Sequence, residues 1–212
     1  MTRLSTDPDW SALLTAFAAA WGNCPDGGSA PIRAHLDEVT RRLAAIRAGD
    51  PACIARPPAD RPVACQLAAA LAAGQSSAAQ QLAQTLVPLA DRLTWEWGYA
   101  DLPDDLARAY AYCELLGPRG PVRADDLILG FVLFAPATFY PPHAHDGICE
   151  SYLTVAGDWS QNHAGVNRPG ALVFNPPGTR HFITTGQSGP CLLAYAWTGD
   201  SARLGTPDMH LD

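Results

Sequence analysis

The chain has 212 residues, 48% of them hydrophobic, and this length and composition suit a folded domain with a core rather than a disordered chain. Its formal net charge is −7 and it has no run of Lys or Arg, which disfavours nucleic acid and anionic membrane as partners. The first residues show no apolar signal segment, and the most apolar runs have about half the length of a membrane span, so we expect a cytoplasmic location.

The first half of the chain reads as helices separated by Pro- and Gly-rich connections. Stretch 7–22 begins with an Asp-Pro cap and ends at a glycine. Stretch 29–50 has a Ser cap, an early Pro and apolar residues at helical spacing, and two alanine-rich stretches follow at 63–74 and 76–93. We expect residues 1–105 to form an α-helical N-terminal extension. It would pack on the following domain or across a homodimer, and the sequence leaves both open.

The pattern changes near residue 108. Short runs rich in β-branched and aromatic residues follow one another, each closed by Gly or Pro, at the spacing of an all-β sandwich or barrel. We therefore expect a mainly β protein whose barrel occupies residues 106–212. The expected strand runs are 109–118, 126–136, 150–157, 171–178, 181–186 and 191–199.

The cysteines are scattered and form no CxxC pair, which disfavours a zinc ribbon or a dithiol redox motif. In a reducing compartment such cysteines are mostly small core residues. Cys149 lies close to Glu150 in the sequence, but strand alternation places the two on opposite faces, so we do not expect a cysteine ligand. The six cysteines are Cys24, Cys53, Cys65, Cys113, Cys149 and Cys191.

One cluster of residues predicts a metal site. His143 and His145 are two positions apart, and residues i and i+2 of an extended strand project to the same face. Glu150 and Tyr152 share a face for the same reason, and the intervening turn can bring the second strand back beside the first. His181 follows a later strand run and a Pro-Pro-Gly turn. Three imidazoles and a carboxylate suit one divalent transition metal ion, such as Zn, Fe(II) or Mn, better than Mg or Ca.

The other three histidines lack such a pattern. His35 falls on an expected helix, His163 lies in a polar loop, and His210 is close to the C-terminus. We expect ordinary packed or solvated side chains at all three positions.

The sequence around the cluster resembles the two motifs of the cupin family. The stretch "HAHDGICESYLTVAG" fits the first motif and "GALVFNPPGTRH" fits the second. The first motif normally opens with Gly where this chain has Ala137, and the second normally closes with Asn where it has Thr185. The resemblance implies a single cupin barrel, a double-stranded β-helix of the jelly-roll type. It also implies the metal ligands His143, His145, Glu150 and His181.

A longer stretch, about residues 95–200, resembles the cupin lyases that act on dimethylsulfoniopropionate (DMSP), which also carry a helical N-terminal part. The shared features are "ELLGPRGP", "LGFVLFAPATFYPPHAH", Glu-x-Tyr, "GDW", "RPGALVFNPPGTRH" and "LLAYAWTG". Two features depart from that group. The spacer between His145 and Glu150 is one residue longer, and "HFITTG" stands where the group has a Met-Arg-Thr-like run.

The resemblance implies a carbon–sulfur lyase that cleaves DMSP to dimethyl sulfide and acrylate by metal-dependent β-elimination. It assigns the base to Tyr152, and a tyrosine beside a cation has a lowered pKa because the phenolate is favoured. Tyr140, three residues before His143, is the second candidate, as an assisting hydroxyl.

The implied substrate is a small sulfonium carboxylate. Aromatic faces attract such a cation, which makes Trp159, Trp197 and Tyr195 candidate walls of the binding site. The aromatic stretch "LTWEWGY" precedes the barrel and is expected to fold over its mouth. Arg180 is the candidate partner of the substrate carboxylate.

Three other functions fit the same residues. An Fe(II) cupin dioxygenase would use the same four ligands, since a metal shell does not encode the reaction. A lyase-like cupin acting on another carboxylate would fit the "HFITTG" departure. A binding cupin without activity fits less well, because all four ligands are present and the helical half shows no helix-turn-helix signature.

Overall fold

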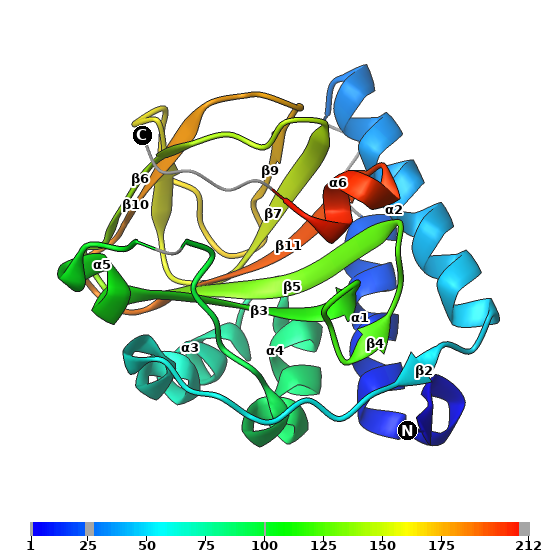
Figure 1. Cartoon of the computed structure of the whole chain (residues 1–212). Coiled ribbons are helices and arrows are strands. Elements are labelled where there is room, and N and C mark those ends of the chain that lie inside the picture. The colour runs from blue at the N-terminus through cyan, green and yellow to red at the C-terminus, as the bar shows by residue number, and fades with distance from the viewer. Residues whose placement is uncertain (1, 24–27, 100, 208–212) are drawn as a thin grey trace.

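The computed structural model describes residues 2–23, 28–99 and 101–207 of the chain. Cys24 and His210 therefore lie outside the described residues. The helices of the first half lie against one face of a large β-sheet (Figure 1). The helices are α1 (Pro8–Gly22), α2 (Ala30–Ala48), α3 (Leu67–Gly74), α4 (Gln80–Leu86), α5 (Asp104–Ala109) and α6 (Ser201–Gly205), with 3-10 turns η1 (Leu4–Thr6), η2 (Pro62–Gln66) and η3 (Val87–Arg92).

The strands form two sheets, one large and one small. The large sheet has the strand order β1-β2-β4-β3-β5-β11-β7-β9, and the small sheet has the order β6-β10-β8. Among these, β6 and β10 lie side by side on the far side of the sheet from α1, α3 and α4 (Figure 1). The strands are β1 (Thr2–Arg3), β2 (Ala52–Cys53), β3 (Tyr110–Gly117), β4 (Val122–Arg123), β5 (Leu127–Phe134), β6 (Phe139–His143), β7 (Ile148–Ala156), β8 (Trp159–Gln161), β9 (Leu172–Asn175), β10 (His181–Thr185) and β11 (Cys191–Gly199).

The first two helices begin and end close to where the sequence predicts them. Asp7 caps α1 by accepting a hydrogen bond of 3.4 Å from the Trp10 backbone N–H, and Pro8 occupies the first turn, where its missing N–H costs nothing. The alanine-rich stretches give shorter helices than predicted, because 3-10 turns replace α-helix around Pro62 and Pro88. Within the described residues, no helix is both long and apolar enough to cross a bilayer.

The first half contains two short strands beside its helices. The short strands β1 and β2 pair with each other, and β2 pairs with β4, so they extend the edge of the large sheet. One continuous core joins the helices to that sheet. The mainly β architecture with helices in the first half is confirmed, whereas the division of the chain at residue 105 stays a prediction.

Strand alternation gives the large sheet two different faces. On β11, Ala194 and Ala196 pack against the helices, whereas Leu193, Tyr195 and Trp197 belong to the core between the two sheets. The same alternation runs through β3, β5 and β7. The site predicted from the sequence therefore lies between the sheets, on the face away from the helices.

The predicted pairing of the two strands that carry the metal cluster is wrong. Strand β6 pairs with β10, whereas β7 pairs with β11 and β9. The turn at Gly147, whose φ of 70° favours glycine, carries the chain from the small sheet to the large one. The histidines and Glu150 therefore approach each other across the interior of the barrel and not along one sheet.

Candidate metal centre and its cavity

Three histidines converge between the sheets. His143 ends β6, His145 lies in the turn that follows, and His181 begins β10 directly opposite His143. Each side chain is buried and offers one nitrogen, and these nitrogens lie within 4.8 Å of one another. The structure thus brings together the three histidines that the sequence singled out. His143 and His145 do not share one strand as predicted, because β6 ends at His143.

The bonding of these imidazoles fits a metal ion. His143 Nδ1 lies 2.9 Å from the Pro141 carbonyl oxygen, and His181 Nδ1 lies 3.0 Å from that of Thr179. An Nδ1–H donated to a carbonyl leaves the lone pair on Nε2, which is how second-shell partners orient metal-binding histidines. Among the described residues, neither of these Nε2 atoms nor either ring nitrogen of His145 has a hydrogen-bond partner. Burial, which acts most strongly, and the neighbouring His181 lower the pKa of His143 to about 3, so its imidazole is neutral and available as a ligand.

Glu150 supplies a carboxylate to the same centre. Its Oε1 lies 3.5 Å from His145 Nε2, and its Oε2 lies 3.1 Å from His181 Nε2. Burial opposes ionisation, but His145 and His181 outweigh it and hold the pKa of Glu150 well below its usual value. Burial also works against a charged His181, yet the close contact with the Glu150 carboxylate raises the pKa of that imidazole. The pair is thus a buried anion beside imidazole nitrogens, which is the donor set expected for a divalent ion.

Two further side chains fix the orientation of this carboxylate. Trp197 Nε1 donates to Glu150 Oε1 at 2.7 Å, and Asn175 Nδ2 donates to Oε2 at 3.0 Å. Trp197, Glu150 and Asn175 are direct cross-strand partners on β11, β7 and β9, so we call them the carboxylate row. Gln161 in turn donates to Asn175 Oδ1 at 2.8 Å. Sequence reasoning missed Asn175 and Gln161, because only strand pairing brings them to Glu150.

Tyr152 lies two residues after Glu150 on β7, so its side chain also points into the space between the two sheets. Its ring centroid is 6.3 Å from that of His181, and the side chain lines the cavity described below. Burial first, and the Glu150 carboxylate second, raise the pKa of the Tyr152 phenol well above its usual value. In the protein chain alone, Tyr152 is therefore a neutral phenol.

Tyr140 lies on the small sheet, on the other side of the centre. Its ring centroid is 4.6 Å from that of His143. Its hydroxyl lies 2.7 Å from that of Tyr99 and donates to that of Tyr110 at 3.4 Å. Sequence reasoning did not single out Tyr99 or Tyr110, which come from the segment before the barrel and from β3.

A cavity of about 390 Å³ opens beside Glu150 and His145. Its walls are largely aromatic, as expected for a site that binds a small organic molecule. Gly98 lines it, so the stretch "LTWEWGY" does reach the cavity, although Trp97 turns outward under Arg61. The aromatic residues along its walls are Tyr110, Tyr112, Tyr140, Tyr152, Tyr195 and Trp197.

The four candidate substrate-binding residues separate into two pairs. Tyr195 and Trp197 line the cavity. Trp159 is buried beside Tyr152, at a centroid distance of 5.9 Å, and donates to Thr154 Oγ1 at 2.7 Å. Neither Trp159 nor the exposed Arg180 is among the described residues that line the cavity.

A different arginine reaches the cavity wall. Arg119 lines it and is held by the buried Glu114 through a contact of 2.9 Å between Nη2 and Oε2.

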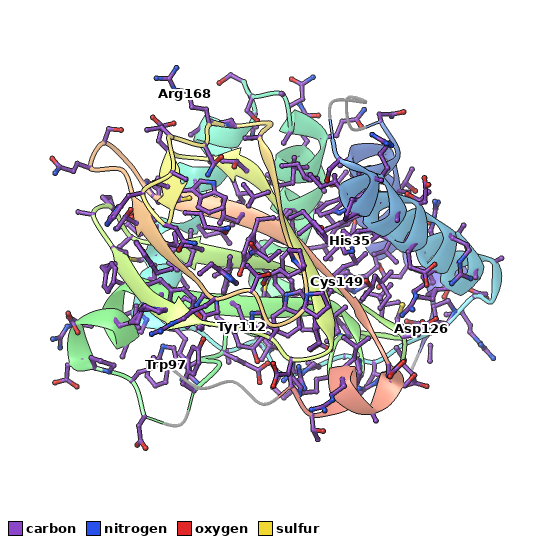
Figure 2. The ribbon with its side chains drawn as sticks, turned by 90° about the horizontal axis from the view of Figure 1, so that it is seen from above. His35, Trp97, Tyr112, Asp126, Cys149 and Arg168 are labelled. Carbon is purple, nitrogen blue, oxygen red and sulfur yellow. The ribbon has the colours of Figure 1, made fainter. Side chains whose placement is uncertain are left out.

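Two residues that we did not expect to bind a metal lie away from the centre. Cys149 lies on the face of β7 opposite Glu150, and His163 is exposed. Figure 2 labels Cys149, on β7, and Tyr112, on β3.

A histidine-rich centre with a carboxylate, set between the two sheets of a small β-barrel, defines a cupin. The comparisons with known proteins agree. A profile of the family "Dimethlysulfonioproprionate lyase", that is, dimethylsulfoniopropionate lyase, matches residues 33–193. The putative dimethylsulfoniopropionate lyase DddL of Cereibacter sphaeroides is 54% identical over 209 residues, which cover 99% of this chain and 90% of the relative. The chain belongs to the DMSP lyase family.

Two solved structures show the same fold. One is described as DMSP lyases RdDddP and RnDddQII; it is 24% identical, with a TM-score of 0.73 over 97% of this chain and 98% of the other. The second is DMSP lyase DddQ from Ruegeria pomeroyi DSS-3, which is 23% identical, with a TM-score of 0.67 over 92% and 93% of the two chains. The cupin fold with N-terminal helices is therefore confirmed along nearly the whole chain.

Proposed function

We propose that this protein cleaves DMSP to dimethyl sulfide and acrylate by β-elimination, with one divalent transition metal ion and Tyr152 as the base. The identity of 54% to a relative named as a DMSP lyase supports the reaction. The observation that carries the mechanism is the group of buried, unpartnered histidine nitrogens beside Glu150, at one end of an aromatic cavity that Tyr152 lines.

The proposed metal ligands are His143, His145, Glu150 and His181. When bound, the ion, which the donor set leaves open as Zn, Fe(II) or Mn, would supply the positive charge that binds the substrate carboxylate, stabilises the enolate-like charge and lowers the pKa of the Tyr152 phenol. Trp197 and Asn175 hold the Glu150 carboxylate in one orientation for this purpose.

Tyr152 is the proposed base, because it shares the strand face of Glu150 and lines the cavity. Its phenolate takes the proton from the carbon next to the substrate carboxylate. The electron pair of that C–H bond forms the double bond of acrylate, and the C–S bond breaks with its pair going to sulfur, which leaves as neutral dimethyl sulfide. Tyr152 then returns its proton to solvent. Tyr140, held by Tyr99 and Tyr110, is proposed to orient the substrate from the opposite wall.

The rest of the cavity suits the sulfonium end of the substrate. The faces of Tyr195 and Trp197 can attract a methylated cation and exclude water from the reacting bonds. Trp159 and Arg180 stay predictions, since Trp159 lies behind Tyr152 and Arg180 lies outside the described lining of the cavity. A homodimer and a cytoplasmic location also stay predictions.

The test is to incubate purified wild-type protein and Tyr152→Phe with DMSP and to quantify dimethyl sulfide and acrylate together. We expect equal amounts of the two products from the wild type, and a loss of about 100-fold to 10,000-fold in kcat for the variant, the range typical of a general base. Full activity in Tyr152→Phe would overturn the base assignment. Absence of both products from metal-loaded wild type would redirect the proposal to another carboxylate substrate.

A further inference from the structure

His35, on α2, is a buried histidine on the helix-facing side of the large sheet, at a position where sequence reasoning predicts only an ordinary packed side chain. Figure 2 labels it beside Cys149 and shows it between α2 and the strands. Its Nε2 lies 2.8 Å from Ser151 Oγ, its Nδ1 lies 3.3 Å from Thr198 Oγ1, and its ring centroid lies 4.9 Å from that of Phe174.

These three contacts fall on three neighbouring strands. Ser151 is on β7, Thr198 on β11 and Phe174 on β9, and the strand order of the sheet there is β11-β7-β9. Each contact residue is the immediate sequence neighbour of one member of the carboxylate row. Because neighbouring residues of a strand point to opposite faces, His35 lies directly behind that row. One imidazole thus bridges the three strands that orient the proposed metal-binding carboxylate.

The polar groups around His35 satisfy one another. Trp21, on α1, donates its indole N–H to Ser151 Oγ at 2.9 Å, which leaves the Ser151 hydroxyl proton free to be donated to His35 Nε2. The Nδ1–H of His35 can then be donated to the Thr198 hydroxyl. Burial is the main cause that lowers the pKa of His35 to about 4, so the imidazole is neutral and has one donor and one acceptor nitrogen, as this chain of bonds requires.

We infer that His35 is a positioning residue for the centre: with Trp21 it fixes Ser151 and Thr198 from behind and thereby holds the carboxylate row in register. This inference rests on the proposed function only in taking Glu150 as a metal ligand. It gives the N-terminal helices a role in the site. Side chains of α1 and α2 bond to Ser151 on the helix-facing side of β7, the strand that carries Glu150 and Tyr152. A buried network in which every member is bonded is rigid, and loss of one member leaves its partners unsatisfied.

The first experiment compares wild type with His35→Leu, which keeps much of the volume but removes both ring nitrogens. Val39→Ala is the matched control: Val39 is a buried residue one turn further along α2, in the helix-facing core. The readouts are the affinity for Co²⁺ and its visible spectrum, the melting temperature, and kcat and KM for DMSP. We expect His35→Leu to bind Co²⁺ about tenfold more weakly, with a changed spectrum and a lower kcat, the lower end of the effect of outer-shell partners. Val39→Ala should lose only thermal stability.

Two more variants make the result decisive. His35→Gln keeps a donor and an acceptor and should recover part of the Co²⁺ affinity lost in His35→Leu. If His35→Leu fails to fold, Ser151→Ala removes the bond to His35 Nε2, and the bond from Trp21, with a smaller change in volume. It should weaken Co²⁺ binding in the same direction. The inference is overturned if folded His35→Leu or Ser151→Ala binds Co²⁺ as the wild type does, with the same spectrum and kcat. It is also overturned if the wild type does not bind Co²⁺.

The Co²⁺ measurements separate this inference from the proposed function. A wild type that binds Co²⁺ but releases no dimethyl sulfide from DMSP would contradict the proposed reaction. The affinity and spectrum of His35→Leu would then still decide whether His35 holds the carboxylate row.

Discussion

The two faces of the large sheet are built from the same strands but have different chemistry. The helix-facing side is packed with Leu, Ala, Val and Phe, and its polar groups, such as Ser151 and His35, are bonded to one another. The barrel side carries tyrosines, a tryptophan and Glu150. Among the described residues, both ring nitrogens of His145 and the Nε2 atoms of His143 and His181 have no hydrogen-bond partner there. Buried polar groups are normally satisfied, so the unsatisfied ones mark where a ligand belongs. The helix-facing side thus maintains the fold and supports the centre from behind through His35, whereas the barrel side presents the groups that would carry out the chemistry.

The largest effect should come from removing a proposed ligand on the barrel side. His181→Ala takes one imidazole from the centre, and we expect activity to fall by more than about 100-fold, beyond the effect of an outer-shell partner, with bound metal falling well below one ion per chain. His163→Ala is the control, since that histidine is exposed and packs against Phe182. Metal content by elemental analysis and dimethyl sulfide release check the prediction, and a metal-replete His181→Ala would contradict it.

On the helix-facing side, a core deletion should cost stability and leave the chemistry unchanged. Leu43 is fully buried on α2, and truncation to Ala should lower the free energy of unfolding by about 3 kcal/mol. Chemical denaturation measures this loss. The kcat of the variant, taken where it is fully folded, should match the wild type. A lower kcat there would show that apolar packing on the helix-facing side, and not only the bonded network at His35, affects the centre.

A substitution at Trp197 tests whether the carboxylate row supports the metal centre. Trp197→Phe keeps a ring but removes the indole N–H that donates to Glu150, and we expect a loss of about 10-fold to 100-fold in activity or metal affinity. Trp97→Phe is a matched control, because its indole N–H donates to the Ala107 carbonyl at 3.2 Å, away from the centre. Equal effects of the two substitutions on metal affinity would argue against a special role of the row.

Because the pKa of the buried His35 is lowered, we expect the stability of the protein to depend on pH. Burial, opposed by Glu150 and helped by Arg42, lowers its pKa from 6.5 to about 4. Between these values the unfolded chain binds more protons than the folded one, so stability is fully retained above pH 6.5 and is lost as the pH falls toward 4. From pH 7 to 5 the wild type should lose about 1–2 kcal/mol more than His35→Leu. Denaturation of both proteins at each pH measures this difference. If their free energies of unfolding fall by the same amount from pH 7 to 5, His35 makes no such contribution.

The smallest effect concerns the turn that leads from the large sheet to the small one. Ala137 stands where the cupin motif normally has Gly, and its φ of 57° lies in the left-handed region that glycine adopts at no cost. Ala137→Gly should raise the free energy of unfolding by about 0.5–1 kcal/mol. Ala135→Gly, two residues earlier at a position without positive φ, should lower it instead. A loss of stability in Ala137→Gly would show that strain at this position is relieved elsewhere.

The sequence predicted the parts of the molecule that local patterns encode. Alternation placed Glu150 and Tyr152 on one face and Cys149 on the other, and capping residues predicted the first two helices. Cross-strand pairing is not encoded locally, so the assignment of β6 and β7 to different sheets was missed. For the same reason, nothing in the sequence linked Asn175 to Glu150, or His35 to Ser151 across more than a hundred residues.

The most direct test of the central claim is dimethyl sulfide release from DMSP by the purified wild type in three states: as isolated, after removal of metal by a chelator, and after Zn, Fe(II) or Mn is restored. We expect release that disappears on chelation and returns with at least one of the ions. Release that persists in chelated protein of verified low metal content would contradict a metal centre at His143, His145, Glu150 and His181.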